Sequence, residues 1–410
     1  MSYLPKLKFY IFILPIILSF SIQSFAGLPP KPEYTAELIQ LRIDSGRVLR
    51  VGRNEAYTLP SMAAKAAHDG DTIEIQADGD YLNDEVIWKQ NNLLIKGVSG
   101  RPYIKNNGVT KNGKGLWVIR GDNITIKNFE FSGAKVKDKN GAALRLEGKN
   151  FHISNSYIHN NQNGILAGNR QSESVIIIEH CEFASNGHGD GLTHNVYIGT
   201  IAKLIFRENY THDANVGHTL KTRARENYIL YNRIIEGNSS YSIDIPDGGY
   251  ALVIGNIIYQ GENTENATMV AYGLENKNRY ANSALDLAYN TFVNERSNGI
   301  FVKTRGNNRI QIKNNLFSGN GKIIEGDAIV INNVHERDLV AKFDVKEVKV
   351  KPKYLNRILD KAVDVVSYHN QLIIPEREFS MNRITNRPLR GQRYDIGAFE
   401  YPAGILDILK

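Results

Sequence analysis

Between residues 70 and 333 the chain alternates apolar and polar positions in short runs, and each run ends in a turn rich in asparagine and glycine. Such alternation is typical of a β-strand that buries one face, so these runs predict many short strands. Helical spacing of apolar residues is found in the alanine-rich segment 58–68 and disappears after it. The pattern therefore predicts an all-β protein with one short helix ahead of its strands.

One phrase recurs in this region: two apolar residues at alternate positions, then asparagine, then an apolar or aromatic residue three positions further on. Its asparagine position is occupied by Asn128, Asn155, His180, Asn209, Asn232, Asn256, Asn290 and Asn314. Their spacing of 23 to 34 residues is typical of a β-solenoid, in which each coil buries its apolar face by stacking. Leucine-rich repeats would need a recurring leucine and a helix per copy, and propeller blades are about 40 residues or longer. The asparagines form either a hydrogen-bonded ladder or simple turns, and both alternatives give the same fold.

Composition supports a single folded domain. The chain has 410 residues, a formal net charge of +7, 43 asparagines and one cysteine. With 42% hydrophobic and 23% charged residues, it has the composition of a globular protein. The single cysteine, Cys181, excludes an intrachain disulfide and a cysteine metal cluster. The continuous repeat reduces the two or three domains that the length allows to one.

Residues 1–26 predict a signal peptide. Lys6 and Lys8 precede an apolar stretch, and small residues follow at positions 24–26. We therefore predict an exported protein, periplasmic or secreted, with an uncleaved N-terminal anchor as the alternative and no membrane span in the mature chain. The predicted organisation is a signal peptide at 1–26, one domain at 27–401 (N-terminal cap 46–75, coils 76–333, C-terminal cap 334–401) and a tail at 402–410.

Several segments resemble a known family. GDTIEIQADGDY, NLLIKGVSGRP and NITIKNFEFSGA are similar to the start of right-handed parallel β-helix proteins of the pectate-lyase-like group, and the helix before them resembles their N-terminal cap. The ending RYDIGAFEY, Arg393 to Tyr401, is similar to a C-terminal signature of secreted β-helix proteins. The resemblance covers roughly residues 46–401. It implies a right-handed parallel β-helix with a short N-terminal capping helix and an irregular C-terminal cap, on which lyases, hydrolases, epimerases and structural proteins are all known.

The alternation predicts which side chains leave the core. Taking the apolar pairs as inward, the inward residues are Leu144/Leu146, Ile165/Ala167, Val196/Ile198, Leu220/Thr222 and Ile243/Ile245. The residues between them form one outward column, which contains Arg145, Leu166, Tyr197, Lys221 and Asp244. Parallel strands lie ~4.8 Å apart, so Tyr197, Lys221 and Asp244 are expected within about 10 Å of one another along one face.

Other reactive side chains are expected beside this column. Arg223 and Asn195 lie two residues from Lys221 and Tyr197, and His194 and His218 are one coil apart. The candidate catalytic residues are Lys221, Arg223, Tyr197, His194, His218 and Asp244. The candidate substrate-binding residues are Arg145, Asn195, His188, Asp190, Arg225, Asp247, Gln260, Tyr272 and Glu275.

This set fits the elimination of a 4-linked uronic acid. Removing the proton next to the sugar carboxylate requires a base, neutralisation of the carboxylate and an acid for the leaving oxygen. We assign Lys221 as base, Arg223 as neutraliser, and Tyr197 or a nearby histidine as acid. The Lys–x–Arg placement also resembles β-helix lyases that act on acidic glycans. The structural alternative is a surface ion pair between Lys221 and Asp244, worth ~0–1 kcal/mol.

The expected partner is an acidic polysaccharide or oligosaccharide, bound by a monomer. A glycoside hydrolase, a uronate C5-epimerase and a non-catalytic carbohydrate-binding protein stay open as alternatives. The sequence lacks the compact carboxylate cluster of classical pectate lyases, so we predict no cofactor and no metal, with Ca²⁺ left open. Histidine ligands for a metal lack tight spacing, and basic residues are not interleaved with aromatic ones, which argues against nucleic acid.

Overall fold

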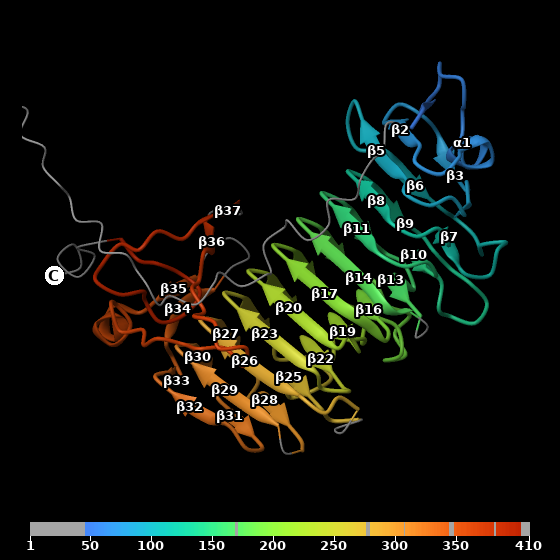
Figure 1. Cartoon of the computed structure of the whole chain (residues 1–410). Coiled ribbons are helices and arrows are strands. Elements are labelled where there is room, and N and C mark those ends of the chain that lie inside the picture. Colours follow the sequence, from blue (N-terminus) through green and yellow to red (C-terminus); the bar gives the residue numbers. More distant parts are fainter. Residues whose placement is uncertain are drawn as a thin grey trace, which may run out of the picture.

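The computed structural model of the chain describes residues 46–168, 171–275, 279–306, 308–343, 348–380 and 383–402. The predicted signal peptide and the tail from residue 403 lie outside these residues. The described part is a solenoid of three parallel sheets, in which each coil contributes one strand to each sheet (Figure 1). The prediction of an all-β parallel β-helix is confirmed, as is the short helix, α1 (Pro60–Ala66).

Sheet A contains the first strand of each coil and has 12 strands within the described residues. Its strands are β1 (Val48–Val51), β2 (Thr72–Gln76), β5 (Leu94–Val98), β8 (Ile124–Lys127), β11 (Phe151–Ser154), β14 (Gln171–Glu179), β17 (Ile201–Arg207), β20 (Glu226–Leu230), β23 (Tyr250–Ile254), β26 (Ala284–Ala288), β29 (Arg309–Lys313) and β32 (Ile329–Ile331).

Sheet B follows sheet A in each coil and has 11 strands over the same described residues. They are β3 (Tyr81–Leu82), β6 (Tyr103–Lys105), β9 (Glu130–Ser132), β12 (Tyr157–His159), β15 (Glu182–Ala184), β18 (Tyr210–His212), β21 (Arg233–Glu236), β24 (Ile257–Gln260), β27 (Thr291–Asn294), β30 (Leu316–Gly319) and β33 (Val334–Glu336).

Sheet C closes each coil, with 10 strands in the part of the chain that the structure describes. They are β4 (Val86–Trp88), β7 (Gly115–Ile119), β10 (Ala142–Leu146), β13 (Asn163–Ala167), β16 (Val196–Ile198), β19 (Leu220–Thr222), β22 (Ile243–Ile245), β25 (Thr268–Tyr272), β28 (Ile300–Thr304) and β31 (Lys322–Glu325).

The core runs through the middle of the solenoid. All the side chains predicted to point inward from sheet C are buried, including Leu144, Val196, Thr222 and Ile245. The apolar ones join one continuous cluster with the inward residues of sheets A and B, among them Phe131 and Phe292. Because each coil covers the apolar face of the next, the stack as a whole buries what no single coil can.

The repeated asparagines belong to two neighbouring columns, not to one. Asn209, Asn232, Asn256 and Asn290 are fully buried, and each side-chain amide donates to the next one along the axis, as Asn256 Nδ2 does to Asn290 Oδ1 at 2.9 Å. Asn128, Asn155, His180 and Asn314 instead lie one position earlier in the turn, where φ is positive. Expecting one equivalent position for all eight was therefore wrong. The ladder continues at Asn315, not at Asn314.

The C-terminal segment covers two outer faces of the solenoid. Ala362, Val365 and Ile373 pack on the outer face of sheet A, and Val348 and Ala398 pack with Ile257 of sheet B. Its regular elements are β34 (Val340–Phe343), β35 (Val348–Val350), a 3₁₀ helix (Pro352–Arg357), β36 (Arg377–Ser380) and β37 (Arg383–Asn386). Figure 1 places these elements (red) away from β13, β16, β19 and β22 of sheet C.

The last coil of the solenoid is only partly covered. Ile329, Val330 and Ile331 in β32 are 52%, 40% and 45% exposed. The described residues after residue 334 pack against the sides of sheets A and B. No described helix is both long and apolar enough to cross a membrane.

Candidate active site on the outer face of sheet C

The predicted outward column exists in the predicted register. Arg145 pairs with Leu166, Leu166 with Tyr197, Tyr197 with Lys221, and Lys221 with Asp244. Each partner belongs to the next coil, so the side chains stack along the solenoid axis on the outer face of sheet C. The column continues through Ala271 to Lys303.

Lys221 is the centre of the cluster. Its Nζ lies 2.9 Å from Asp244 Oδ2 and 2.9 Å from Glu275 Oε1. Burial of the ammonium opposes the charged form, but the two carboxylates outweigh it and raise the pKa of Lys221 above its ordinary value. Lys221 is therefore an ammonium at neutral pH. Burial raises the pKa of Asp244 to about 6, although the Lys221 charge acts in the opposite direction.

Arg223 lies beside Lys221 and is held on three sides. Its Nε donates to the Tyr197 hydroxyl at 3.2 Å, and its terminal nitrogens bind Asp247 and Glu275. Asp247 is fully buried, whereas the Glu275 side chain is 47% exposed. Asp247 thus binds the guanidinium from its buried side, while Glu275 covers it from the solvent side.

Two histidines form the edge of the cluster. The rings of His194 and His218 stack with centroids 4.8 Å apart, and His218 Nε2 lies 3.4 Å from Asp244 Oδ2. The Nδ1 atoms of both rings accept backbone N–H groups, from His218 and Tyr241 respectively. Burial, with the nearby Lys221 charge, lowers the pKa of His194 to about 3 and that of His218 to about 2. Both imidazoles are therefore neutral at physiological pH.

Residues that the sequence did not single out complete the site. Arg279 Nη1 lies 3.3 Å from Asp247 Oδ2 and its Nη2 donates to Thr200, while the Tyr280 hydroxyl donates to the Arg223 carbonyl. Together with Glu275 they come from the chain between β25 and β26. A sequence signal was available: the 34-residue spacing between Asn256 and Asn290 is the longest in the series, which indicates an insertion.

Three predicted substrate-binding residues are not on this face. Asn195 is fully buried and donates to Thr211 Oγ1 inside the coil. Gln260 is fully buried and donates to the Asn266 carbonyl. Tyr272 is fully buried, and its hydroxyl donates to the Gly249 carbonyl. Placing these side chains at the site was wrong, because β24 and β25 direct Gln260 and Tyr272 into the solenoid and the turn before β16 directs Asn195 there.

The remaining candidates lie around the cluster. Arg145 is two coils from Tyr197 in the same column, and Arg225 is exposed in the turn after Arg223. His188 and Asp190 belong to the loop before β16, in which Asp190 accepts from the Thr193 hydroxyl at 3.1 Å. His188 lines a separate hollow with Lys135 and Asn215, while Asp247 and Glu275 are part of the cluster itself.

The residues present do not fit a calcium site. Ca²⁺ needs six to eight oxygen ligands around one point. Asp244, Asp247 and Glu275 are each paired with a lysine or an arginine. Within the described ranges, no group of three or more His, Cys, Asp or Glu side chains is placed to hold a metal ion.

Comparisons with known proteins agree with this architecture. The family model of the right-handed β-helix region matches residues 91–217. Among solved structures, the crystal structure of pectate lyase Pel9A is similar with a TM-score of 0.54 at 14% identity, over 88% of this chain and 98% of that chain. No curated protein matches in sequence. The chain is therefore a right-handed parallel β-helix protein with a pectate-lyase-like fold.

Proposed function

We propose that the protein cleaves an acidic, uronic-acid-containing polysaccharide by β-elimination on the outer face of sheet C. The fold it shares with a pectate lyase supports a lyase-like activity. The observation that carries the proposal is the Glu275 carboxylate, which lies between Lys221 and Arg223. One Glu275 oxygen contacts Lys221 Nζ and the other contacts the Arg223 guanidinium.

A uronate carboxylate presents the same two oxygens as Glu275. Of the three carboxylates in the cluster, Asp244 and Asp247 are buried, and Glu275 alone has an exposed side chain. Glu275 also belongs to the insertion, so it can be displaced without breaking a strand. We therefore infer that the substrate carboxylate takes the place of Glu275, that the Arg223 guanidinium neutralises it, and that the sugar then lies beside the Lys221 amine.

Neutralisation prepares the sugar for elimination. The base takes the C5 proton, the electron pair of that bond forms the C4=C5 double bond, and the C4–O bond breaks. The leaving oxygen then receives a proton. Because both histidines are held neutral, with Nδ1 as an acceptor, the Tyr197 phenol is better suited than an imidazolium to supply that proton. Lys221 in its free-base form is the proposed proton acceptor.

The pH dependence of cleavage follows from this role. Because its raised pKa keeps Lys221 protonated at neutral pH, only a small fraction of the enzyme holds the free base. We expect kcat/KM to rise about tenfold for each pH unit through the neutral range, as the free-base fraction rises. An optimum near pH 6 would contradict the lysine base and favour a hydrolase that uses Asp244, whose pKa is about 6.

The product separates the alternatives. Incubation with a panel of uronic-acid polysaccharides should release unsaturated uronates, detected by ultraviolet absorbance. Reducing ends without this absorbance would show hydrolysis instead. A changed uronate stereochemistry in an uncut chain, seen by NMR, would show epimerisation, and binding without any of these changes would leave a carbohydrate-binding protein.

Glu275→Gln tests the displacement step. Removing the charge weakens the contacts that the substrate must replace, so we expect KM to fall by about tenfold with kcat nearly unchanged, equivalent to one lost charge-assisted contact. Glu325→Gln is the matched control, because Glu325 pairs with Lys303 of the same column at 2.6 Å. A rise in KM for Glu275→Gln alone would mean that Glu275 binds the substrate.

A further inference from the structure

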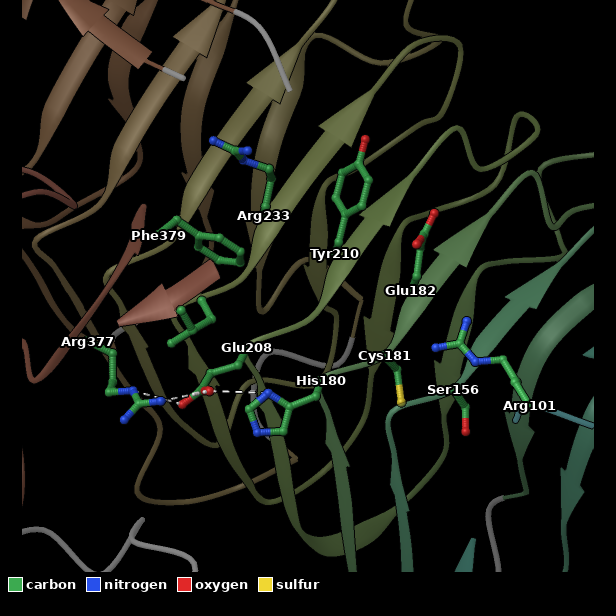
Figure 2. Close-up of a pocket in the computed structure, with 11 residues that line it drawn as sticks. Arg101, Ser156, His180, Cys181, Glu182, Glu208, Tyr210, Arg233, Arg377 and Phe379 are labelled. Atoms are coloured by element: carbon green, nitrogen blue, oxygen red, sulfur yellow. Dashed lines mark hydrogen bonds and ion pairs between the residues drawn. The ribbon is translucent and has the colours of Figure 1, made fainter. Parts of the chain in front are cut away.

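A cavity lies on another side of the solenoid, where the β36–β37 hairpin packs beside sheet B (Figure 2). Its volume of about 660 Å³ is within the range of pockets that hold small ligands. One wall is an outward column of sheet B, in which Glu182, Tyr210 and Arg233 pair in register. The other wall consists of Arg377, Phe379 and their neighbours in the hairpin.

The turn between sheets A and B joins the two walls. His180 and Glu208 occupy the same turn position in two consecutive coils, with φ of 53° and 56°. The same position in other coils is occupied by Asn128 and Asn155, and asparagine tolerates this conformation better. The Glu208 carboxylate lies 3.3 Å from the His180 ring and forms an ion pair with Arg377 at 3.4 Å, which fixes the hairpin to the solenoid (Figure 2).

The cavity has an excess of positive charge. Three arginines, Arg101, Arg233 and Arg377, line it against the two carboxylates of Glu182 and Glu208. Glu208 balances the charge of Arg377, as described above, and Glu182 lies 3.3 Å from His212, so the positive charge of the cavity comes from the exposed Arg101 and the buried Arg233. Arginine binds carboxylates in a planar, two-pronged geometry, so this lining favours an anionic group in the ligand.

The cavity also presents aromatic surface. Tyr210 and Phe379 both line it, and the Arg233 guanidinium lies 5.4 Å from the centre of the Phe379 ring. The faces of sugar rings carry C–H groups that pack on aromatic rings, while their hydroxyls bind arginine and glutamate side chains. A small inorganic anion would leave most of this volume and all of the aromatic surface without a contact.

We propose that this cavity is a second binding site, which takes a negatively charged sugar of an acidic oligosaccharide. It involves no covalent step and shares no residue with the outer face of sheet C. A test of binding in this cavity is therefore separate from a test of the proposed elimination.

Calorimetric titration with an oligomer of galacturonic acid tests the site. In the Lys221→Ala/Arg223→Ala variant, which lacks the cations of the sheet C face, we expect the remaining binding to be salt-sensitive. Arg101→Glu, at an exposed position, should weaken it by at least about tenfold, and Phe379→Leu by several fold. Lys105→Glu is the matched control, because Lys105 is exposed nearby but does not line the cavity. The protein without any substitution should show two binding events, one at each site. Arg101→Glu alone should remove one of them.

Three results would overturn the proposal. The first is absence of binding in the double variant while its far-ultraviolet circular dichroism matches that of the unsubstituted protein. The second is equally tight binding of a neutral galactose oligomer, which would remove the argument from charge. The third is an unchanged affinity in both Arg101→Glu and Phe379→Leu.

Discussion

Replacing Lys221 and Arg223 together by alanine should lower kcat/KM for an acidic polysaccharide by at least about 10³-fold, since a general base and a charge-neutralising group are removed at once. Lys221 is the proposed proton acceptor, and Arg223, which binds Glu275 in the structure, is proposed to neutralise the substrate carboxylate. Without Lys221 the C5 proton has no acceptor from this strand, and without Arg223 the developing negative charge on the sugar has no partner from it. The measurement is the initial rate of ultraviolet-absorbing product over a range of substrate concentrations.

The fold should survive this change. Both side chains point out of the solenoid, and the inward neighbours Leu220 and Thr222 remain. Asp244, left without Lys221, can take up a proton because burial already raises its pKa to about 6. Lys303→Ala removes an equivalent lysine from the same column and should leave the rate unchanged. Elimination activity that persists in the double variant would disprove the assigned roles.

Asn256→Ala should destabilise the protein by about 3–5 kcal/mol, because it leaves several buried polar groups without partners. Asn256 is fully buried, and its Nδ2 donates to the carbonyl oxygens of Ile229 and Ile254 and to Asn290 Oδ1. Its Oδ1 accepts from both the backbone and the side chain of Asn232. Alanine can replace none of these bonds, and the gap lies in the middle of the ladder.

The midpoint of urea unfolding, followed by circular dichroism, measures this effect. Asn155→Ala is the control: Asn155 is exposed in the neighbouring turn column with φ of 53°, so alanine there costs only about 1–2 kcal/mol of backbone strain. Equal shifts in the two variants would mean that the ladder bonds contribute nothing beyond turn conformation. That result would support the simple-turn interpretation of the asparagines.

The register of sheet C could be predicted because its cause is local. Apolar residues two positions apart must both face the core, so the residue between them must face outward. This rule, together with the 23-residue spacing of the repeat, placed Lys221 and Asp244 in neighbouring coils, and the structure pairs them. The same rule failed at Asn195, which lies where the turn enters β16 and is buried. At such a turn the chain changes direction, and strict alternation no longer determines where a side chain points.

The asparagine columns show a second limit. The sequence phrase aligns Asn314 with Asn290, yet the structure aligns Asn315 with Asn290. The two asparagine columns differ by one position in the turn: the earlier position has positive φ, and the next one forms the ladder. The repeated sequence phrase looks the same whichever of the two positions its asparagine occupies. Only the hydrogen bonds between coils distinguish the two columns.

The sequence by itself determined the class of fold, the parallel stacking of the coils and the column that contains Tyr197, Lys221 and Asp244. These depend on apolar periodicity, which each coil expresses locally. The tertiary structure decided what surrounds that column: the insertion that places Glu275 and Arg279 over it, and the inward course of Gln260 and Tyr272. It also decided where the β36–β37 hairpin packs, and so created the cavity beside sheet B. These contacts join residues far apart in the chain, and no local pattern encodes such distances.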